Sequence, residues 1–313
     1  MNNKVIVCGS IAYDDIMFFD GKFSDSLMKE NLNNLSVSFL AGDRNKYFGG
    51  CSMNIAYSLK LLGMTPTVVG AAGNDFDEYA KWFKENGIST DSVIINDDRP
   101  CACAFILNDN AQSQIAVFSP SAMGNKNLAM NFDGVDVDGA SYAIIGPDLP
   151  DRIVSLSKAC LKADVKYIFD PGQAMPALSD EQLENLVADA FGLILNDYES
   201  ELLSKRLGKS LDDLSHSLSF LLKTLGENGV QIFSAEGSYT VPAITGLNVV
   251  EVTGCGDAFR SGFIAGLLSN SGLKRACEMG CVSASYVLEM MGTQKHHFTL
   301  DEFDARLIKN YGA

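Results

Sequence analysis

The stretch VVEVTGCGDAFRSGFIAGLL, residues 249–268, joins an apolar strand-like run to a glycine-broken turn and the start of a helix. Gly254 and Gly256 carry no side chains, so consecutive backbone N–H groups of the turn are able to point into one space. That space lies at the positive end of the following helix, where anions bind. We therefore predict an anion site at this turn.

Asp257 is the one carboxylate early in this helix. A carboxylate repels the anion that the turn attracts, unless it serves the reaction of that anion by taking a proton from an attacking hydroxyl. The alternative interpretation makes Asp257 the N-cap of the helix and the glycines ordinary turn formers. These residues alone leave both interpretations open.

Length and composition indicate a folded α/β protein. The chain has 313 residues, and its 47% hydrophobic content is enough for the core of one large domain or two small ones. The net charge of −15 repels nucleic acid and anionic membrane surfaces, so we expect neither as a partner. A small phosphorylated ligand is compatible with this charge because local amides and a metal ion are able to hold it.

The eight cysteines form no CxxC pair, which argues against a zinc site and against a disulfide framework. Free, mostly buried thiols are expected instead. The N-terminus runs directly into the strand-like VIVCG, without the basic and long apolar regions of a signal peptide, and no run of eighteen apolar residues occurs. These features predict a cytoplasmic protein.

Strand-like and helix-like segments alternate along the chain, beginning with a buried strand at Lys4–Cys8. Such alternation is typical of a parallel sheet covered by helices. Turn residues around GENG, residues 226–229, indicate that the strands after residue 220 continue the sheet in antiparallel fashion. The clearest alternating segments are 142–145 (strand), 152–163 (helix), 166–170 (strand), 181–190 (helix) and 193–196 (strand).

Two excursions leave this pattern, at about residues 14–47 and 99–120. The first contains the strand-like DIMFF and LSVSFL, residues 15–19 and 35–40, and the second a probable hairpin around Asn108-Asp109-Asn110. Both faces of CACAFIL, residues 101–107, are apolar, so a small sheet built from these strands needs cover on each side. One side is able to close over a ligand and the other to meet a second copy, which predicts a homodimer. The alternative is a hairpin packed on the core.

Several polar residues follow predicted strands or open helices. Gly49 and Gly50 precede a helix and allow a ligand to approach the backbone, while Asn54 early in that helix offers an amide to hydroxyl groups. Asp14 lies just past the first predicted strand, as a turn residue or as a ligand contact. Asn196 and Glu199, three apart at a helix start, suit a hydrated Mg²⁺ or simple helix capping.

Four motifs occur in an order that resembles the ribokinase-like PfkB family of carbohydrate and nucleoside kinases, over nearly the entire chain. They are FGGCSMNIAYSLKLLG (48–63), NDYE (196–199), TLGENG (224–229) and TGCGDAFRSGF (253–263). The C-terminal signature of the family, commonly DTxGAGD, appears here with Glu at 251, Val at 252 and Cys at 255. Its catalytic glycines and aspartate are intact.

The resemblance implies one ribokinase-like catalytic domain over residues 1–313, with a doubly wound, mainly parallel sheet flanked by helices and a small β-stranded lid. It implies an ATP- and Mg²⁺-dependent kinase that phosphorylates a primary hydroxyl. Asp257 is then the general base, and the N–H groups of Gly254, Cys255 and Gly256 form the anion hole. Asp14, Gly49, Gly50 and Asn54 bind substrate hydroxyls. Asn196, Thr224, Gly226, Gly229 and Gly292 lie at the nucleotide, and Asn196 and Glu199 reach the metal through water.

The acceptor is less sharply indicated. GSIAYDDIM (9–17), VSFLAGDRNKYFGG (37–50) and FDPGQ (169–173) look like bacterial adenosine kinases of this family, which implies a 5′-type hydroxyl of adenosine or a related nucleoside. The alternative is a sugar kinase for fructose, ribose or a similar substrate. Phe39, Phe105 or Phe118 offers a stacking platform for a base, or simply fills the lid core. Arg260 faces a phosphate or forms a surface ion pair.

Other classes of protein fit less well. The chain has no GxxxxGK[ST] sequence, which excludes a Walker-type phosphate cradle, and neither glycine cluster has the dinucleotide-binding pattern after the first strand. A nicotinamide oxidoreductase is therefore disfavoured. A nucleoside or sugar sensor without catalysis is disfavoured by the intact Asp257 and glycine turn.

Overall fold

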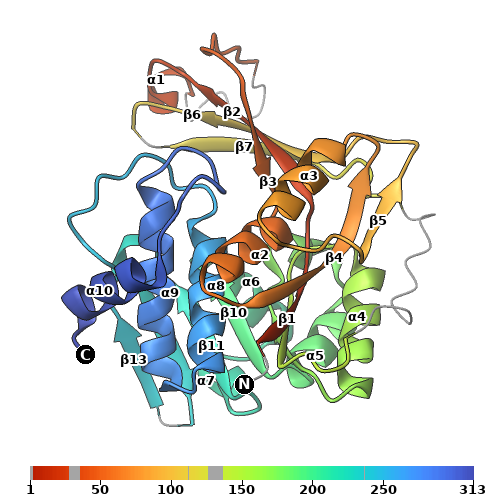
Figure 1. The fold of residues 1–313 in the computed structure, drawn as a ribbon, viewed down its shortest axis with the longest axis vertical. Coiled ribbons are helices and arrows are strands. Elements are labelled where there is room, and N and C mark those ends of the chain that lie inside the picture. The colour runs from red at the N-terminus through yellow and green to blue at the C-terminus, as the bar shows by residue number, and fades with distance from the viewer. Residues whose placement is uncertain (1–2, 28–35, 112, 126–136, 236) are drawn as a thin grey trace.

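The computed structural model describes residues 3–27, 36–111, 113–125, 137–235 and 237–313, and its strands form two sheets (Figure 1). The large sheet has nine strands in the order β13-β12-β11-β10-β9-β8-β1-β4-β5. These are β1 Lys4–Cys8, β4 Thr65–Gly73, β5 Val93–Asn96, β8 Tyr142–Ile145, β9 Lys166–Phe169, β10 Gly192–Asn196, β11 Phe220–Thr224, β12 Val230–Ser234 and β13 Gly237–Val241.

The large sheet is mainly parallel, as the alternation predicts. The strands from β5 to β11 pair in parallel, and β12 and β13 continue the sheet in antiparallel fashion. From β1 the chain winds to β4 and β5 on one side and later to β8, β9 and β10 on the other. In sheets wound in two directions, ligands bind at the carboxyl ends of the strands where the winding reverses.

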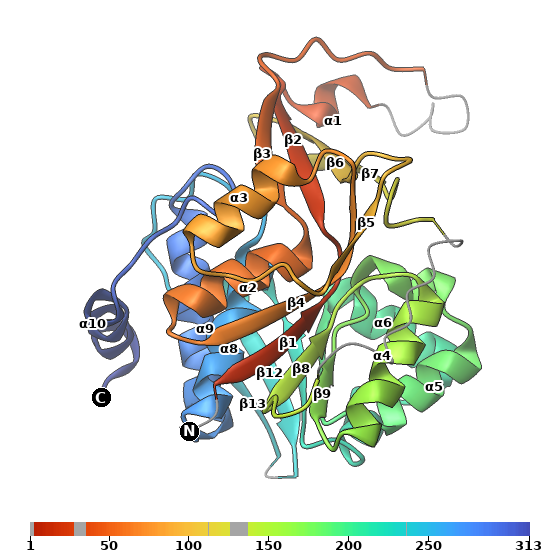
Figure 2. The same cartoon turned by 45° about the vertical axis from the view of Figure 1, so that its right-hand side comes forward.

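Helices cover both faces of this sheet (Figure 2). Successive side chains of a strand point to opposite faces, so apolar residues on each face need cover. Ile6 and Cys8 pack with α4 Pro150–Lys162, α5 Asp180–Ala188 and α6 Asp197–Leu207. Val5 and Val7 pack with α2 Cys51–Leu61, α8 Cys255–Leu268 and α9 Gly272–Leu288. The remaining helices are α1 Phe23–Ser26, α3 Asp77–Glu85, α7 Leu211–Ser215 and α10 Leu300–Tyr311, with short 3-10 turns η3 Gly172–Ala177 and η4 Gly226–Asn228.

Helices α8 and α9 approach each other closely, at small residues of both helices. A Cβ on Gly262 would collide with the backbone of Met279, and one on Gly266 with Ala276. Cys277 of α9 lies in the same buried cluster as the apolar residues of α8. The close contact fixes the axis of α8, whose first turn carries the predicted anion site.

The second sheet has four strands in the order β3-β2-β6-β7 and lies above the carboxyl ends of the large sheet (Figure 1). Strands β6 and β7 form the predicted hairpin. Its turn is longer than predicted, because the Asp109 carboxylate accepts from the N–H groups of Phe23, Ala111 and Ser113. The four strands are β2 Ala12–Phe18, β3 Asn45–Gly49, β6 Ala102–Asn108 and β7 Gln114–Ser119.

The predicted strand LSVSFL is wrong over its described part, residues 36–40; Leu35 lies outside the described residues. Phe39 packs edge-on against Phe19 and Phe23, and Leu40 is 92% exposed, so this segment does not alternate as a strand does. The strand of the first excursion that pairs with β2 is β3.

Three further elements were not predicted. β5 and α7 have only four and five residues, whereas α10 is amphipathic and begins with a capping box of Thr299 and Glu302, a signal that the sequence does carry. All eight cysteines are free thiols. Within the described ranges, no helix combines the length and apolar character that crossing a membrane requires.

Candidate active site

The anion turn, defined here as residues 254–256, leads into α8. Its N-cap is Gly254, with a φ of 80°, and a Cβ there would lie 2.8 Å from Thr293 Cγ2. Both the backbone conformation and the contact therefore require glycine. The first N–H groups of a helix have no intrahelical partner. The N–H of Cys255 makes a long bond of 3.3 Å to the carbonyl of Val252.

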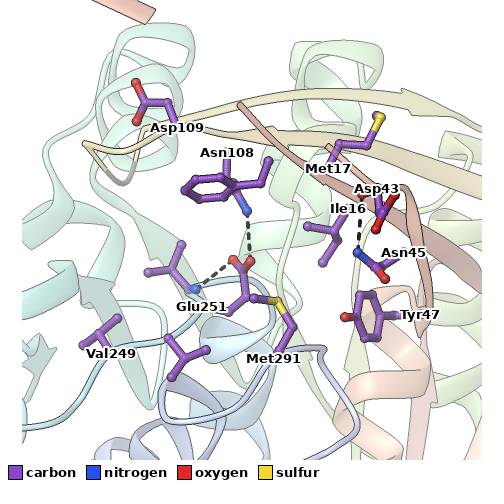
Figure 3. A pocket seen from close by; sticks show the side chains of 13 residues that line it. Ile16, Met17, Asp43, Asn45, Tyr47, Asn108, Asp109, Val249, Glu251 and Met291 are labelled. Carbon is purple, nitrogen blue, oxygen red and sulfur yellow. Dashed lines mark hydrogen bonds between the residues drawn. The ribbon is translucent and has the colours of Figure 1, made fainter. Parts of the chain in front are cut away.

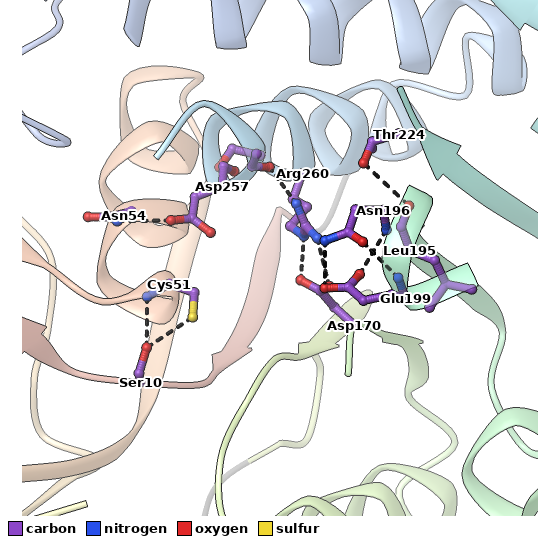
Figure 4. Close-up of polar contacts among 12 residues, drawn as sticks. Ser10, Cys51, Asn54, Asp170, Leu195, Asn196, Glu199, Thr224, Asp257 and Arg260 are labelled. Carbon is purple, nitrogen blue, oxygen red and sulfur yellow. Dashed lines mark hydrogen bonds and ion pairs between the residues drawn. The ribbon is translucent and has the colours of Figure 1, made fainter. Parts of the chain in front are cut away.

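Asp257 is the third residue of α8, so the interpretation of Asp257 as the N-cap is wrong. Its carboxylate instead accepts a hydrogen bond of 2.9 Å from Asn54 Nδ2 on α2, and points away from the helix start toward that helix (Figure 4). Burial raises the pKa of Asp257 to about 6, against the opposing effects of Arg260 and the Asn54 hydrogen bond. At neutral pH this carboxylate is mostly ionised and is basic enough to accept a proton.

Asn54 is buried and held in one orientation. Its Oδ1 accepts a bond of 2.9 Å from Gln294 Nε2, which leaves Nδ2 facing Asp257. The assignment of the two amide atoms therefore follows from the network. The predicted contact residue Asn54 thus also holds the carboxylate of Asp257, the predicted general base.

The contact of Gln294 with Asn54 was not predicted from the sequence. Its Oε1 accepts a bond of 3.1 Å from Trp82 Nε1, and its Nε2 also donates to the hydroxyl of Tyr79. The Tyr79 hydroxyl in turn donates to the carbonyl of Gly49 over 2.9 Å. Gln294 is 240 residues from Asn54, so the local sequence carries no signal for the contact.

Asp14 lies inside β2 and is buried, so its prediction as a loop residue is corrected. A Cβ on Gly49 would occupy the position of the Asp14 carboxylate, and one on Gly50 would lie 2.5 Å from the carbonyl of Ser10. The paired glycines therefore make room for Asp14 and for the backbone beside it. Burial, and next the charge of Asp257, raise the pKa of Asp14 to about 7. The structure thus brings Asp14, Gly49, Gly50 and Asn54 together beside Asp257.

Arg260 forms an ion pair, but not at the surface. Its Nε and Nη2 both donate to Asp170, the Nη2 bond being 2.7 Å, and the two side chains are 12% and 3% exposed. Arg260 Nη1 also donates to the carbonyl of Gly256 over 2.9 Å. This pair ties the end of β9 to the anion turn, and the positive charge of Arg260 counteracts the burial of Asp257.

Asn196 and Glu199 form a closed capping box at the start of α6 (Figure 4). Glu199 accepts from the N–H of Asn196 over 2.8 Å and from its Nδ2 over 2.9 Å, while Asn196 Oδ1 accepts from the N–H of Glu199 over 2.8 Å. Burial raises the pKa of Glu199. In the described part of the chain, no three His, Cys, Asp or Glu residues cluster as a metal site. The capping interpretation is confirmed, and the metal role stays a prediction.

The predicted nucleotide residues fall into two groups. Asn196 and Thr224 are register neighbours at the carboxyl ends of β10 and β11, and Gly226 and Gly229 follow in the turn after β11. The Cβ position of Gly226 is open, whereas a Cβ on Gly229 would strike the carbonyl of Val241. Gly292 directly precedes Thr293, which contacts Gly254 of the anion turn, and a Cβ on Gly292 would sit 2.5 Å from the ring of Tyr47 on β3.

A cavity of about 280 Å³ separates the small sheet from residues 249–252 (Figure 3). None of Asp14, Asn54 and Asp257 lines it, so it lies beside the cluster of carboxylates and not on it. Its wall is mostly apolar, with Glu251 at the centre of the view. The lining residues are Ile16, Met17, Phe18, Asp43, Asn45, Tyr47, Asn108, Asp109, Val249, Val250, Glu251, Val252 and Met291.

A family comparison agrees with this arrangement of a glycine turn, a buried carboxylate with a raised pKa and neighbouring buried polar groups. Residues 6–298 match the family described as pfkB family carbohydrate kinase. The chain belongs to the pfkB family. It is accordingly a phosphotransferase that acts on an alcohol group, with the ribokinase-like fold that the four motifs predict.

Individual relatives of this pfkB-family kinase extend over almost its whole length. A nucleoside kinase of Methanocaldococcus jannaschii is 28% identical over 269 residues, covering 85% of this chain and 87% of its own. The nucleoside kinase of Burkholderia thailandensis, solved in complex with inosine, is 32% identical with a TM-score of 0.87, covering 99% and 98% of the two chains. A ribokinase of Thermotoga maritima, at 20% identity and a TM-score of 0.77, shares the fold.

Proposed function

We propose that this kinase uses ATP and Mg²⁺ to phosphorylate the primary 5′-hydroxyl of adenosine or a related nucleoside, with ADP as the second product. The observation that carries the proposal is the position of Asp257. Its carboxylate is three residues from the N-cap of α8 yet is bonded to Asn54 on a second helix, beside the buried Asp14. Base, anion turn and hydroxyl-binding residues thus meet in one place.

The chemistry follows from this placement. The acceptor hydroxyl gives its proton to Asp257 while the oxygen attacks the terminal phosphoryl group. The anion turn and the positive end of α8 stabilise the negative charge on that group. Asp14, with its raised pKa, receives hydrogen bonds from neighbouring hydroxyls of the sugar, and Asn54 holds the base in position.

Mg²⁺ fits this chain as a hydrated ion, not as one enclosed by protein ligands. Both oxygens of Glu199 already accept hydrogen bonds from Asn196, which leaves lone pairs for water but no free carboxylate. Mg²⁺ keeps several waters and is commonly held by one or two carboxylates together with substrate phosphates. Glu199 would hold its water shell, and the ion would neutralise charge on the phosphates.

Of the three phenylalanines predicted as platforms for a nucleobase, Phe118 is the best placed. Along the small sheet Asp14 pairs with Ala104, and Ala104 pairs with Phe118, so the three share one face. Phe105 pairs with Asp15, lies on the opposite face and is 40% exposed, and Phe39 packs on Phe19 and Phe23. We propose that a base attached to a ribose at Asp14 stacks on Phe118.

The relatives support a nucleoside acceptor. The B. thailandensis enzyme named a nucleoside kinase was also solved in complex with ADP-inosine, at 32% identity and a TM-score of 0.88. Contacts of Asp14 and Asn54 with hydroxyl groups would recognise the sugar, but they would not distinguish the group attached to it. The alternative acceptor is therefore a free sugar such as fructose or ribose.

A panel of acceptors tests the proposal. Coupled ADP release is measured with adenosine, inosine, other nucleosides, ribose and fructose. We expect a purine nucleoside to give the highest kcat/KM, and a clear preference for a free hexose would overturn the nucleoside assignment. Phe118→Ala should raise the KM for the nucleoside about tenfold, since stacking of a base contributes about 1–3 kcal/mol. The matched variant Phe105→Ala, on the opposite face, should leave it unchanged.

We also propose that the outer face of the small sheet joins two copies of the chain. Phe105 is 40% exposed and Val117 is 61% exposed on this face. Exposed apolar surface of this kind is typical of protein interfaces. Light scattering should give a dimer mass for the native protein and a monomer mass for Val117→Asp, whereas a native monomer would contradict the proposal.

A further inference from the structure

We propose that Glu251 is a positioning residue that couples the small sheet to the anion turn through Asn108. This inference rests on the proposed role of that turn in phosphoryl transfer. Glu251 is buried, and its two carboxylate oxygens have different partners. One oxygen shapes the chain that enters the turn, and the other holds the small sheet.

Oε1 of Glu251 gathers donors from its own segment. It accepts from the N–H of Val252 over 2.9 Å, from the N–H of Thr253 over 3.1 Å and from the Thr253 hydroxyl over 2.9 Å. Residues 249–253 belong to no helix or strand, so these bonds take the place of a regular ladder. Thr253 is followed directly by the N-cap Gly254. The path of the chain into the anion turn therefore depends on this carboxylate.

Oε2 of Glu251 reaches across to the small sheet. It accepts a bond of 2.9 Å from Asn108 Nδ2, at the end of β6 and 143 residues away in the sequence (Figure 3). Asn108 Oδ1 accepts from Gln114 Nε2 over 3.2 Å, which fixes the orientation of its amide. Gln114 Nε2 also donates to the Thr253 hydroxyl over 3.2 Å. The facing ends of β6 and β7 thus contact both Glu251 and Thr253, in the segment that leads into the anion turn.

The cavity beside Glu251 makes these polar contacts important. About 280 Å³ of space separates residues 249–252 from the underside of the small sheet, so the two parts are not closely packed there. A rigid, close-packed interface would transmit position through many contacts, whereas here specific hydrogen bonds bridge the gap. The same sheet carries Asp14, at the acceptor site. Movement of the sheet to admit an acceptor therefore acts on Asn108 and, through Glu251, on the anion turn.

Asn108→Asp tests the coupling because it places a carboxylate against Glu251. We expect kcat at pH 8 to fall about thirtyfold, since a like-charge pair replaces a charged hydrogen bond. The double variant Glu251→Gln with Asn108→Asp restores a donor facing an acceptor, and should return kcat to within about threefold of the native value.

Asn110→Asp is the matched control at the same hairpin. Asn110 Nδ2 donates to Asp20 Oδ1 over 3.0 Å, so this change also creates a carboxylate pair, but an exposed one that does not involve Glu251. We expect kcat within about twofold of the native enzyme, because exposed charge pairs contribute little. Thermal unfolding of all variants shows whether any loss comes from the stability of the fold.

Hydrogen exchange gives a readout that does not need turnover. Amides of residues 252–256 should exchange faster in Asn108→Asp than in the native protein, and return to the native rate in the double variant. The coupling is wrong if the double variant is as impaired as the single one, or if Asn110→Asp is as harmful as Asn108→Asp. A native protein that releases ADP with no acceptor would contradict the proposed function, while the exchange experiment would still decide the coupling.

Discussion

Helices α6 and α8 both carry an acidic residue in the first turn, but the two residues have different partners. Each carboxylate is three residues after the N-cap: Glu199 after Asn196, and Asp257 after Gly254. In α6 the carboxylate returns to the N-cap and closes a capping box. In α8 the N-cap has no side chain to pair with, and the shorter Asp257 turns to Asn54 on α2.

The difference shows how one position in a helix serves either stability or chemistry. The Glu199 carboxylate satisfies N–H groups that the helix leaves without partners. Asp257 does not bond back to its own N-cap, and only its Oδ2 accepts from Asn54, so in the proposed mechanism its other oxygen is available to the acceptor and the α8 amides to an anion. A carboxylate with this freedom is suited to accept a proton, and one inside a capping box is not.

Asp257→Asn should produce the largest effect. Loss of the general base is expected to lower kcat by about a thousandfold, with nucleoside binding retained. The folded-state pKa of about 6 lies above the ordinary value of 3.8, so ionised Asp257 makes the fold less stable at pH 8 than at lower pH. The Tm of the variant at pH 8 should therefore equal or exceed that of the native protein. Turnover near the native rate would remove Asp257 from the mechanism.

Gly254→Ala should lower kcat about a hundredfold, because the methyl group would meet Thr293 and the backbone would have to leave its positive φ. Gly208→Ala is the matched control. Gly208 also has a positive φ, 64°, but its Cβ position is open. This control should cost about 1 kcal/mol of unfolding free energy and leave kcat unchanged. Equal losses of kcat in both variants would point to general strain.

Glu199→Gln should have the smallest effect on turnover. The unfolding free energy should change by less than about 1 kcal/mol, because Gln also completes a capping box and burial raises the pKa of the native carboxyl. Weaker holding of the water shell of Mg²⁺ should reduce kcat about tenfold and raise the Mg²⁺ concentration needed for half activity. A loss as large as that of Asp257→Asn would show that the two helix starts are not used differently.

Local patterns predicted most of the fold. The mainly parallel sheet and its antiparallel continuation after residue 220 are confirmed, because they depend on local alternation and on turn residues near each other in the sequence. LSVSFL failed because its alternating pattern also suits a loop whose Phe39 joins an aromatic cluster. The LSVSFL error shows that hydrophobic alternation does not fix which of two neighbouring segments forms the strand.

For the site too, local features were predicted and long-range contacts were not. The glycine turn and the positions of Asp257 and Asn54 follow from motifs, whereas the partners of these residues do not. Asn54 is held by Gln294, 240 residues away, and Glu251 is held by Asn108, 143 residues away. Contacts of this range depend on the packing of complete elements. The sequence around Arg260 likewise does not indicate that this residue forms a buried ion pair with Asp170.

The ionisation of Asp257 tests the central claim most directly. In protein labelled with ¹³C at the aspartate carboxyl carbons, the resonance lost in Asp257→Asn identifies this residue, and its chemical shift is followed from pH 3 to pH 9. We predict a pKa of about 6, with kcat/KM falling as pH is lowered through the same range, because the protonated carboxyl accepts no proton from the hydroxyl. A pKa at or below 3.8, or a kcat/KM that stays constant down to pH 5, would contradict the account.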